Sequence, residues 1–252
     1  MFFRILFQSG LVSYLVLNNG WSGTPAIVAY CIGFLLCIVI PYFLGSLNAA
    51  ILISKVFYHD DIRNHGSGNA GATNMLRTYG TKAGIFTFLG DLLKTLLAVL
   101  FGSITLGYFA GGAAVAGFFC ILGHVFPVFS HFRGGKGVAS AGTIMILLNL
   151  NSLEGLLLIG VLILVFTVIA VGTKYISLAS VVGVLIYPVL QSQLNVWMAD
   201  ANGNPVYMPF KAFLAFLTAF IVVFRHWDNL KRLRDGTESK ISFSKGSRAP
   251  KA

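Results

Sequence analysis

Charged side chains are scarce in this 252-residue chain, in which Asp, Glu, Lys and Arg make up only 10% of the residues. An ordinary soluble domain carries about 25% charged residues. With 56% hydrophobic residues and 22 Phe, the chain has too little polar surface to cover a water-soluble particle of its size. The composition therefore excludes a soluble globular protein and predicts an all-α polytopic membrane protein.

Acidic residues are the scarcest charged type, since 8 Asp and Glu stand against 18 Lys and Arg and leave a net charge of +10. In a soluble protein such an excess would indicate nucleic-acid binding. In a membrane protein, Lys and Arg collect in the cytoplasmic loops, which accounts for the excess. We therefore expect no nucleic-acid partner.

Cysteine and several catalytic motifs are also scarce or missing. Cys31, Cys37 and Cys120 all lie inside apolar runs, without the spacing of a disulfide framework or a metal site. The chain has no G-x-S-x-G elbow, no H-E-x-x-H zinc motif and no His-x4-Asp acyltransferase signature. These absences argue against a covalent serine enzyme, a zinc protease and a thioester-dependent acyltransferase, and we expect no metal or other cofactor.

Seven apolar runs stand between polar segments, and each is a candidate membrane-spanning helix. The fourth is short for a crossing, so we expect it to be tilted or only partly embedded. The runs are Ile27–Ser54, Ala83–Tyr108, Gly112–Phe129, Val138–Leu150, Leu153–Gly172, Ile176–Leu194 and Phe210–Phe224. We expect residues 1–25 to form an N-terminal extension with an interfacial helix, residues 26–236 the membrane domain, and residues 237–252 a basic cytoplasmic tail.

The basic residues predict the orientation of these helices. The segments 55–82, 132–137, 173–175 and the stretch after Phe224 hold all Lys and Arg except Arg4, Lys94 and Lys211, so 15 of the 18 share one side. The positive-inside rule makes that side cytoplasmic. The N-terminus is then outside, the C-terminus inside, and segment 196–209 is an outside loop. An odd number of crossings follows, and seven fits.

The longest segment assigned to the inside is rich in glycine and runs from His65 to Arg77. Three glycines within residues 66–71 let the backbone turn its N–H groups toward one point, which suits an oxyanion. A flexible polar connector is the alternative, but such a connector rarely ends in Arg while omitting acidic residues. The candidate phosphate-binding residues are Ser67, Gly68, Asn69, Thr73, Asn74 and Arg77.

A second inside loop, Phe132–Gly137, offers Gly134 and Gly135 for close backbone approach and Lys136 as a point charge for a phosphate. It is not a Walker A loop, because Gly137 follows the Lys where Ser or Thr is needed. His124, just ahead of this loop, is either catalytic or structural. Asp91 and Lys94 stand three residues apart in the second run, and we expect a mainly structural ion pair on one helix face.

Two further segments carry candidate residues. Ser177 begins the sixth run, where a hydroxyl is ordinarily a helix cap. The exit from the last run contains His226, Asn229 and Arg232. A lipid-facing basic segment explains the Arg there but explains the His and Asn less well.

In order and content, these motifs resemble the bacterial acyl-phosphate:glycerol-3-phosphate acyltransferases, the PlsY family. The resemblance runs from about Tyr42 to Glu238. It rests on Gly45-Ser46, on Gly66 to Asn69 with Gly71 to Asn74 and Arg77, on Gly123-His124, and on Phe132 to Ala139.

The resemblance implies a seven-helix enzyme of the bacterial inner membrane whose active site faces the cytoplasm. Such an enzyme transfers a fatty acyl group from acyl phosphate to the 1-hydroxyl of glycerol 3-phosphate, giving lysophosphatidate and phosphate. It needs no cofactor, and its partners are the two substrates, membrane lipids and, as a candidate, the enzyme that makes acyl phosphate. By resemblance, Lys136, Ser177, His226 and Asn229 are catalytic, and Arg232 joins the substrate-binding residues.

Two alternatives stay open at this point. The general base is either His226 or an oxygen of the donor's own phosphate. The rival function is a transporter or lipid translocator that uses the same basic surface without chemistry. A transporter would place polar groups at the bilayer midplane. Here they gather toward one face, which favours the enzyme.

The orientation can be tested by thiol labelling. A cysteine introduced between Gly66 and Asn74, or after Gly236, should react with membrane-impermeant reagents only after the inner face has been exposed. A chain without the introduced cysteine provides the background. Labelling of intact spheroplasts from the periplasm would contradict the orientation argued from Lys and Arg.

Overall fold

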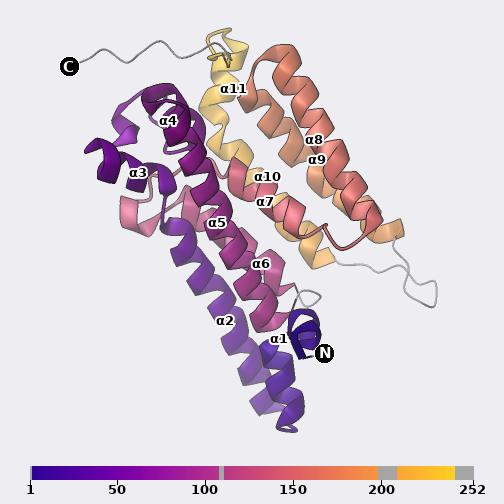
Figure 1. The fold of residues 1–252 in the computed structure, drawn as a ribbon. Coiled ribbons are helices and arrows are strands. Elements are labelled where there is room, and N and C mark those ends of the chain that lie inside the picture. Colours follow the sequence, from indigo (N-terminus) through magenta and orange to yellow (C-terminus); the bar gives the residue numbers. More distant parts are fainter. Residues whose placement is uncertain (1, 108–110, 198–208, 242–252) are drawn as a thin grey trace. The chain divides into compact units, whose positions relative to one another are not determined.

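The computed structural model describes residues 2–107, 111–197 and 209–241, and within these ranges every regular element is a helix (Figure 1). The chain divides into two compact units, of which unit 1 runs from the N-terminus to Ile144 and unit 2 begins at Met145. The all-α prediction is confirmed for the described residues. Tyr108 and most of the expected outside loop and basic tail, residues 198–208 and 242–252, lie outside them.

The elements of unit 1 are α1 (Phe2–Asn18), α2 (Thr24–Ser46), α3 (Ala49–Tyr58), η1 (Ile62–Asn64), α4 (Ala72–Tyr79), α5 (Thr81–Leu106), α6 (Gly112–Val125) and η2 (Val128–Ser130). Helix α7 (Val138–Leu147) crosses the boundary between the units. Unit 2 continues with α8 (Leu153–Thr173), α9 (Ile176–Trp197), α10 (Pro209–Arg225) and α11 (Trp227–Arg234).

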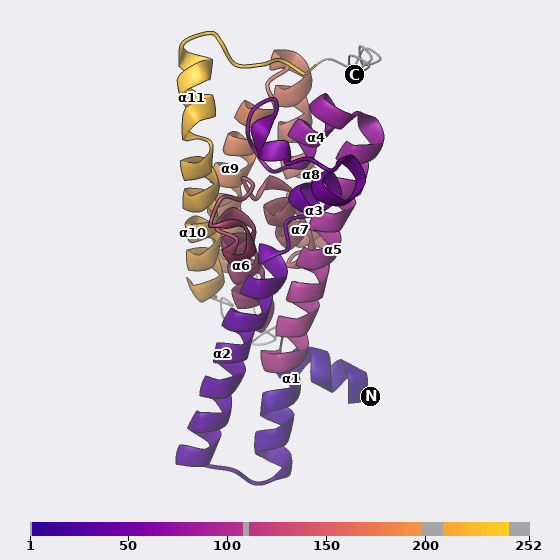
Figure 2. The same ribbon diagram turned by 90° about the vertical axis from the view of Figure 1, so that its left-hand side faces the viewer.

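Unit 1 is built on α2, α5 and α6, which lie side by side (Figure 2). Glycine lets α2 and α6 approach closely, because a Cβ on Gly45 would lie 2.0 Å from the Cys120 carbonyl oxygen. A Cβ on Gly123 would lie equally close, 2.0 Å from the Tyr42 oxygen. Small residues at a helix interface allow this backbone approach in membrane proteins, where packing replaces the hydrophobic driving force.

The first predicted run is broken near its end. Helix α2 stops at Ser46, and α3 begins at Ala49 because the Asn48 side chain accepts a hydrogen bond from the Ile51 N–H at 3.1 Å. This is the usual role of Asn at a helix N-cap. The break turns the chain out of α2 just before the glycine-rich loop.

Five segments of the described chain are long and apolar enough to cross a membrane, and α10 with α11, bent by 56°, makes a sixth if the pair is one span. At 1.5 Å per residue, ten-residue α7 reaches only about 15 Å, which is half of the roughly 30 Å hydrocarbon core. The number of seven crossings and the orientation therefore stay predictions. The five segments are Thr24–Tyr58, Thr81–Leu106, Gly112–Ser130, Leu153–Thr173 and Ile176–Gln193.

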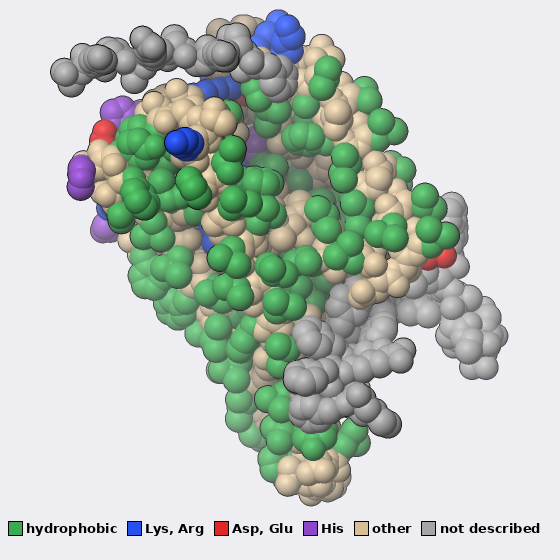
Figure 3. All heavy atoms as spheres, in the orientation of Figure 1, with side chains coloured by type: hydrophobic (Ala, Val, Ile, Leu, Met, Phe, Trp, Pro, Cys, Tyr) green, Lys and Arg blue, Asp and Glu red, His purple; other side chains and the backbone are tan. Residues whose placement is uncertain are grey.

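Large apolar side chains cover the outward faces of these helices (Figure 3). Leu35 on α2, Phe86 on α5 and Leu164 on α8 are 57%, 62% and 63% exposed. An exposed apolar surface on this scale marks a membrane contact rather than a water-facing surface.

The N-terminal extension is part of unit 1 and packs against two of its helices. Helix α1 is kinked at Gly10, whose φ is 82°, and a Cβ at this position would lie 2.3 Å from the Gly107 nitrogen. Helix α1 thus contacts the end of α5, and it also contacts α2. Its interfacial location stays a prediction.

Candidate functional site

The glycine-rich loop of unit 1 is closed by one buried side chain. Asn74, only 2% exposed, donates through Nδ2 to the carbonyl oxygens of His65 at 2.9 Å and Ile62 at 3.2 Å. Its Oδ1 accepts from the Ser67 N–H at 3.0 Å. The sequence predicts that this amide binds a phosphate. In the structure these three hydrogen bonds use the amide to shape the loop, and its role toward a phosphate stays a prediction.

Two of the three loop glycines take the left-handed conformation, with φ of 56° at Gly66 and 69° at Gly68. A Cβ at Gly66 would lie 2.3 Å from Asn74 Oδ1, so the turn requires glycine there. However, the N–H groups of Gly68 and Gly71 donate to the carbonyl oxygens of His65 and Asn69, at 2.9 and 3.0 Å. The prediction that these two N–H groups face an oxyanion is wrong, because the loop uses them to close itself.

The outward side of the same loop carries the other candidate residues. Ser67, Thr73 and Arg77 are exposed, and Asn69 is half-buried. Thr73 and Arg77 are four apart on α4 and so share one face of that helix. Helix α4 starts after Gly71, whose lack of a side chain leaves no side-chain cap on the first turn. A helix start of this kind favours an anion, and these side chains add hydroxyl, amide and guanidinium donors.

The second loop packs against the first loop and against His124 of α6. Gly135 donates its N–H to the His124 carbonyl oxygen at 3.1 Å. A Cβ on Gly135 would lie 2.2 Å from His124 Nε2 and 2.8 Å from the Ala70 carbonyl oxygen, which belongs to the first loop. The close backbone approach expected at Gly134 and Gly135 is therefore made to the protein itself. Lys136 follows at once and is half-buried.

Arg63 joins the two loops and was not singled out from the sequence. It binds Asp61 with two hydrogen bonds, Nε to Oδ1 at 2.9 Å and Nη2 to Oδ2 at 2.6 Å. Its Nη1 donates to the Ser130 carbonyl oxygen at 3.0 Å, at the entrance of the second loop. The guanidinium holds the pKa of Asp61 below its ordinary value. Unit 1 thus packs the two loops against each other, through Arg63 and through the approach of Gly135 to Ala70.

A second cluster forms in unit 2 around Glu238. This carboxylate, 7% exposed, accepts from Ser177 Oγ at 2.8 Å, Asn229 Nδ2 at 2.7 Å and Arg232 Nε at 2.8 Å. Burial raises the pKa of Glu238, but the three hydrogen bonds outweigh it and hold that pKa below its ordinary value. Three of the four predicted residues of this unit therefore converge on one anionic group.

His226 lies in the same unit, at the bend between α10 and α11. The ring is buried, with Nδ1 2.7 Å from the Val222 carbonyl oxygen. Because a carbonyl only accepts, Nδ1 carries the proton, and in the neutral ring the lone pair resides on Nε2. The backbone thus fixes both the tautomer and the orientation of the imidazole.

Glu238 itself is not among the residues predicted from the sequence. The residues around it fold back onto the helices: Thr237 and Glu238 donate their N–H groups to the Arg232 oxygen at 2.8 and 3.1 Å, and Ile241 donates to the Lys174 oxygen at 2.8 Å. The described start of the predicted tail therefore packs as part of unit 2. The carboxylate was the available signal, since it is one of only 8 in the chain.

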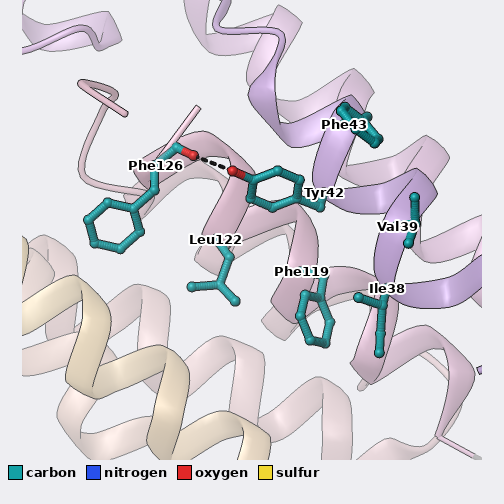
Figure 4. Close-up of a pocket in the computed structure, with 7 residues that line it drawn as sticks. All are labelled: Ile38, Val39, Tyr42, Phe43, Phe119, Leu122 and Phe126. Atoms are coloured by element: carbon teal, nitrogen blue, oxygen red, sulfur yellow. Dashed lines mark hydrogen bonds between the residues drawn. The ribbon is translucent and has the colours of Figure 1, made fainter. Parts of the chain in front are cut away.

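An apolar cavity of about 310 Å³ opens between α2 and α6 of unit 1 (Figure 4). Its rim is fixed by Tyr42, whose hydroxyl donates to the Phe126 carbonyl oxygen at 2.8 Å. The cavity suits an alkyl chain rather than a polar ligand. It is lined by Ile38, Val39, Tyr42, Phe43, Phe119, Leu122 and Phe126.

No group of three or more His, Cys, Asp or Glu among the described residues is placed to hold a metal ion.

The chain is similar in sequence to known proteins. The family model for glycerol-3-phosphate acyltransferase matches residues 35–236. The glycerol-3-phosphate acyltransferase of Finegoldia magna is 37% identical over 206 residues, covering 81% of this chain and 93% of the relative. That of Streptococcus pyogenes serotype M5 is 38% identical over 213 residues, covering 83% and 93%.

Two solved structures are also similar to this chain. The crystal structure of PlsY (YgiH), an integral membrane glycerol 3-phosphate acyltransferase, in its glycerol 3-phosphate form gives a TM-score of 0.68 at 31% identity, covering 83% of this chain and 96% of that one. Its lysphosphatidic acid form gives 0.66 at 30% identity, covering 83% and 95%.

The Glu238 cluster gives a prediction about stability and pH. Replacing Glu238 by Gln removes the charge that Arg232 faces, and should lower the free energy of unfolding at neutral pH by about 1 kcal/mol. Because the folded-state pKa is lowered, the wild-type advantage is fully present above the unfolded pKa of about 4.3 and is lost as the pH falls through the folded value.

Thermal unfolding of the two proteins in detergent between pH 3 and 7 measures this difference. Asp235→Asn is the matched control, because its pair with Arg234 is exposed and should contribute little. Equal stability of wild type and Glu238→Gln at pH 7 would show that the cluster does not hold unit 2 together.

Proposed function

Because this multi-pass membrane chain belongs to the glycerol-3-phosphate acyltransferase family, we propose that it transfers a fatty acyl group from acyl phosphate to the 1-hydroxyl of glycerol 3-phosphate. The products are lysophosphatidate and inorganic phosphate. The observation that carries the proposal is the family match over residues 35–236, which includes both loops of unit 1 and the segment from His226 to Arg232. The donor rests on the resemblance of these motifs to enzymes that use acyl phosphate.

The chemistry asks for positioning more than for a reactive side chain. Both substrates carry a phosphate, and the acyl group is already activated, with phosphate as its leaving group. The 1-hydroxyl oxygen attacks the acyl carbon, the bond from that carbon to the phosphate oxygen breaks, and the hydroxyl proton passes to a base. Holding two anions in register and stabilising the tetrahedral oxyanion can supply most of the acceleration.

The site residues divide between these tasks. In unit 1, Arg77 offers a bidentate contact to a phosphate and Lys136 offers a point charge, while Ser67, Asn69 and Thr73 add neutral donors. Asn74, Gly134 and Gly135 keep the loops in shape. In unit 2, the Glu238 carboxylate accepts hydrogen bonds from Ser177, Asn229 and Arg232 and so fixes the positions of these three side chains.

Two candidates for the base remain in this proposal. His226 presents Nε2 as an acceptor, because its Nδ1 is held by the Val222 carbonyl oxygen. An oxygen of the donor's phosphate is the other candidate, since the leaving group gains basicity as its bond to carbon breaks. Either accepts the hydroxyl proton without a covalent enzyme intermediate.

We place this reaction in the bacterial inner membrane, with the N-terminus outside and the active site facing the cytoplasm. The support is the distribution of Lys and Arg. Membrane lipids surround the chain, and the enzyme that makes acyl phosphate is a candidate partner, because it would supply the donor at the same membrane face.

The donor is the most direct test of the function. Purified protein incubated with acyl phosphate and glycerol 3-phosphate should yield lysophosphatidate and phosphate in equal amounts, and acyl-CoA should yield no product. Equal turnover of acyl-CoA would contradict the donor assignment. Movement of labelled substrate into vesicles without any lysophosphatidate would favour the translocator.

Arg77 and Lys136 test the anion-binding role of unit 1. Arg77→Ala removes charge-assisted hydrogen bonds worth about 1.5–3 kcal/mol, which corresponds to roughly a ten- to hundredfold rise in the KM of at least one substrate. Lys136→Ala should lose most activity, and Lys136→Arg should keep a little, because geometry matters as well as charge.

Steady-state kinetics with both substrates varied measures these effects. Arg234→Ala is the charge-matched control, since Arg234 is exposed and pairs only weakly with its neighbour Asp235. Unchanged KM values for both substrates in Arg77→Ala would mean that the loop is a connector.

A further inference from the structure

Three buried polar side chains of unit 1, Asp91, Lys94 and His124, are not among the residues that received a task in the proposed reaction. On α5, Lys94 Nζ lies 2.9 Å from Asp91 Oδ1, which confirms the expected ion pair. The same Nζ lies 2.7 Å from Nδ1 of His124 on α6, and that nitrogen is 3.4 Å from Asp91 Oδ1. All three side chains are at most 7% exposed. Burying charged groups is costly even when they are paired, so stability alone is a weak reason to retain them.

Lys94 connects this triad to the first loop. Its ammonium donates to the carbonyl oxygens of Gly45 at 3.2 Å and Leu47 at 3.3 Å, where α2 ends. The next residue is Asn48, whose Nδ2 donates to the Ala70 carbonyl oxygen at 3.2 Å. Lys94 therefore fixes the chain break from which Asn48 holds the glycine-rich loop.

His124 connects the triad to the second loop. Its carbonyl oxygen accepts the Gly135 N–H at 3.1 Å, and its Nε2 occupies the space beside Gly135 that a Cβ would need. The Ala70 carbonyl oxygen of the first loop also lies close to Gly135, 2.8 Å from where its Cβ would be. Gly135 is thus the point where both loops meet, and the triad supports that point along two routes, through Asn48 with Ala70 and through the imidazole.

We propose that Asp91, Lys94 and His124 form a positioning unit that sets the register between the two loops, and so between Lys136 and the exposed donors of Ser67–Arg77. The inference rests on the proposed function, because it assigns the unit a role in that reaction. None of the three is a catalytic residue, since each acts through the loops that it holds. A change far from the chemistry that misplaces a reacting group by about 1 Å can lower the rate about a hundredfold.

The test separates positioning from stability. Lys94→Met alone leaves the Asp91 carboxylate buried without its charge partner, so it should destabilise the protein. The double variant Asp91→Asn/Lys94→Met removes both charges at similar volume, so its thermal unfolding midpoint should rise well above that of Lys94→Met, although the carbonyl oxygens of α2 still lack their donor. Its kcat/KM should nevertheless stay at least tenfold low, because the carbonyl oxygens of α2 have lost the ammonium. Recovery of activity together with stability would overturn the proposal.

A second variant covers the case in which the double variant does not fold. In His124→Asn, the amide can replace Nδ1 toward Lys94, but the part of the ring that lies against Gly135 is lost. We expect normal stability and at least a fivefold loss of kcat/KM. In a Lys136→Ala background the same change should cost much less, because both act on one loop. Full, additive loss in that background, or no loss in the wild-type background, would refute positioning through Lys136.

Ser103→Ala is the matched control on α5, since this buried hydroxyl donates within its own helix to the Val99 oxygen at 2.8 Å. It should leave kinetics unchanged. The wild type separates the two proposals: no lysophosphatidate from wild-type protein would reject the acyl-phosphate reaction, whereas normal wild-type turnover with unaffected triad variants would reject only the positioning unit.

Discussion

The site of unit 1 depends on one interaction, the hydrogen bonds from the ammonium group of Lys94 on α5 to the carbonyl oxygens at the end of α2. A helix that ends leaves its last carbonyl oxygens without partners inside the helix, so other groups must satisfy them. Lys94 Nζ meets the Gly45 and Leu47 oxygens from the neighbouring helix α5, and Asp91 and His124 lie beside the charge. The chain is thereby free to stop α2 and enter the glycine-rich loop.

The loops repeat this principle on a smaller scale. Asn74 satisfies the His65 and Ile62 oxygens and the Ser67 N–H, and Arg63 satisfies the Ser130 oxygen of the second loop. Side chains that look available to a ligand in the sequence are thus engaged in closing the backbone. The groups that face outward, Ser67, Thr73 and Arg77, rest on a scaffold whose polar groups are already paired.

Composition and hydropathy predicted the helices, because hydrocarbon leaves the backbone few other structures. The Asp91–Lys94 pair was equally readable, since residues three apart share a helix face. The direction of the Asn74 amide and the role of Glu238 were not readable. For Asn74, the spacing of residues along a loop does not say which side chains face inward. For Glu238, the hydrogen bond from Ser177 joins residues 61 positions apart in the sequence. The predicted N–H nest failed at Gly68 and Gly71 for the same reason, because backbone groups bonded within the loop look identical in sequence to free ones.

The acyl-phosphate donor proposed above would explain why rigidity matters more in this protein than a reactive nucleophile. Acyl phosphate reacts with any well-placed hydroxyl, including water, so an enzyme that uses it must favour one acceptor by position. A flexible loop would admit several approach geometries, and each of these would spend binding energy on ordering rather than on the transition state. Loops whose amides, carbonyls and buried charges are already bonded to one another leave little to order when the substrates bind. On this argument the buried triad would act on the proposed reaction through the loops: it holds Gly135, and Gly135 belongs to the loop that carries Lys136.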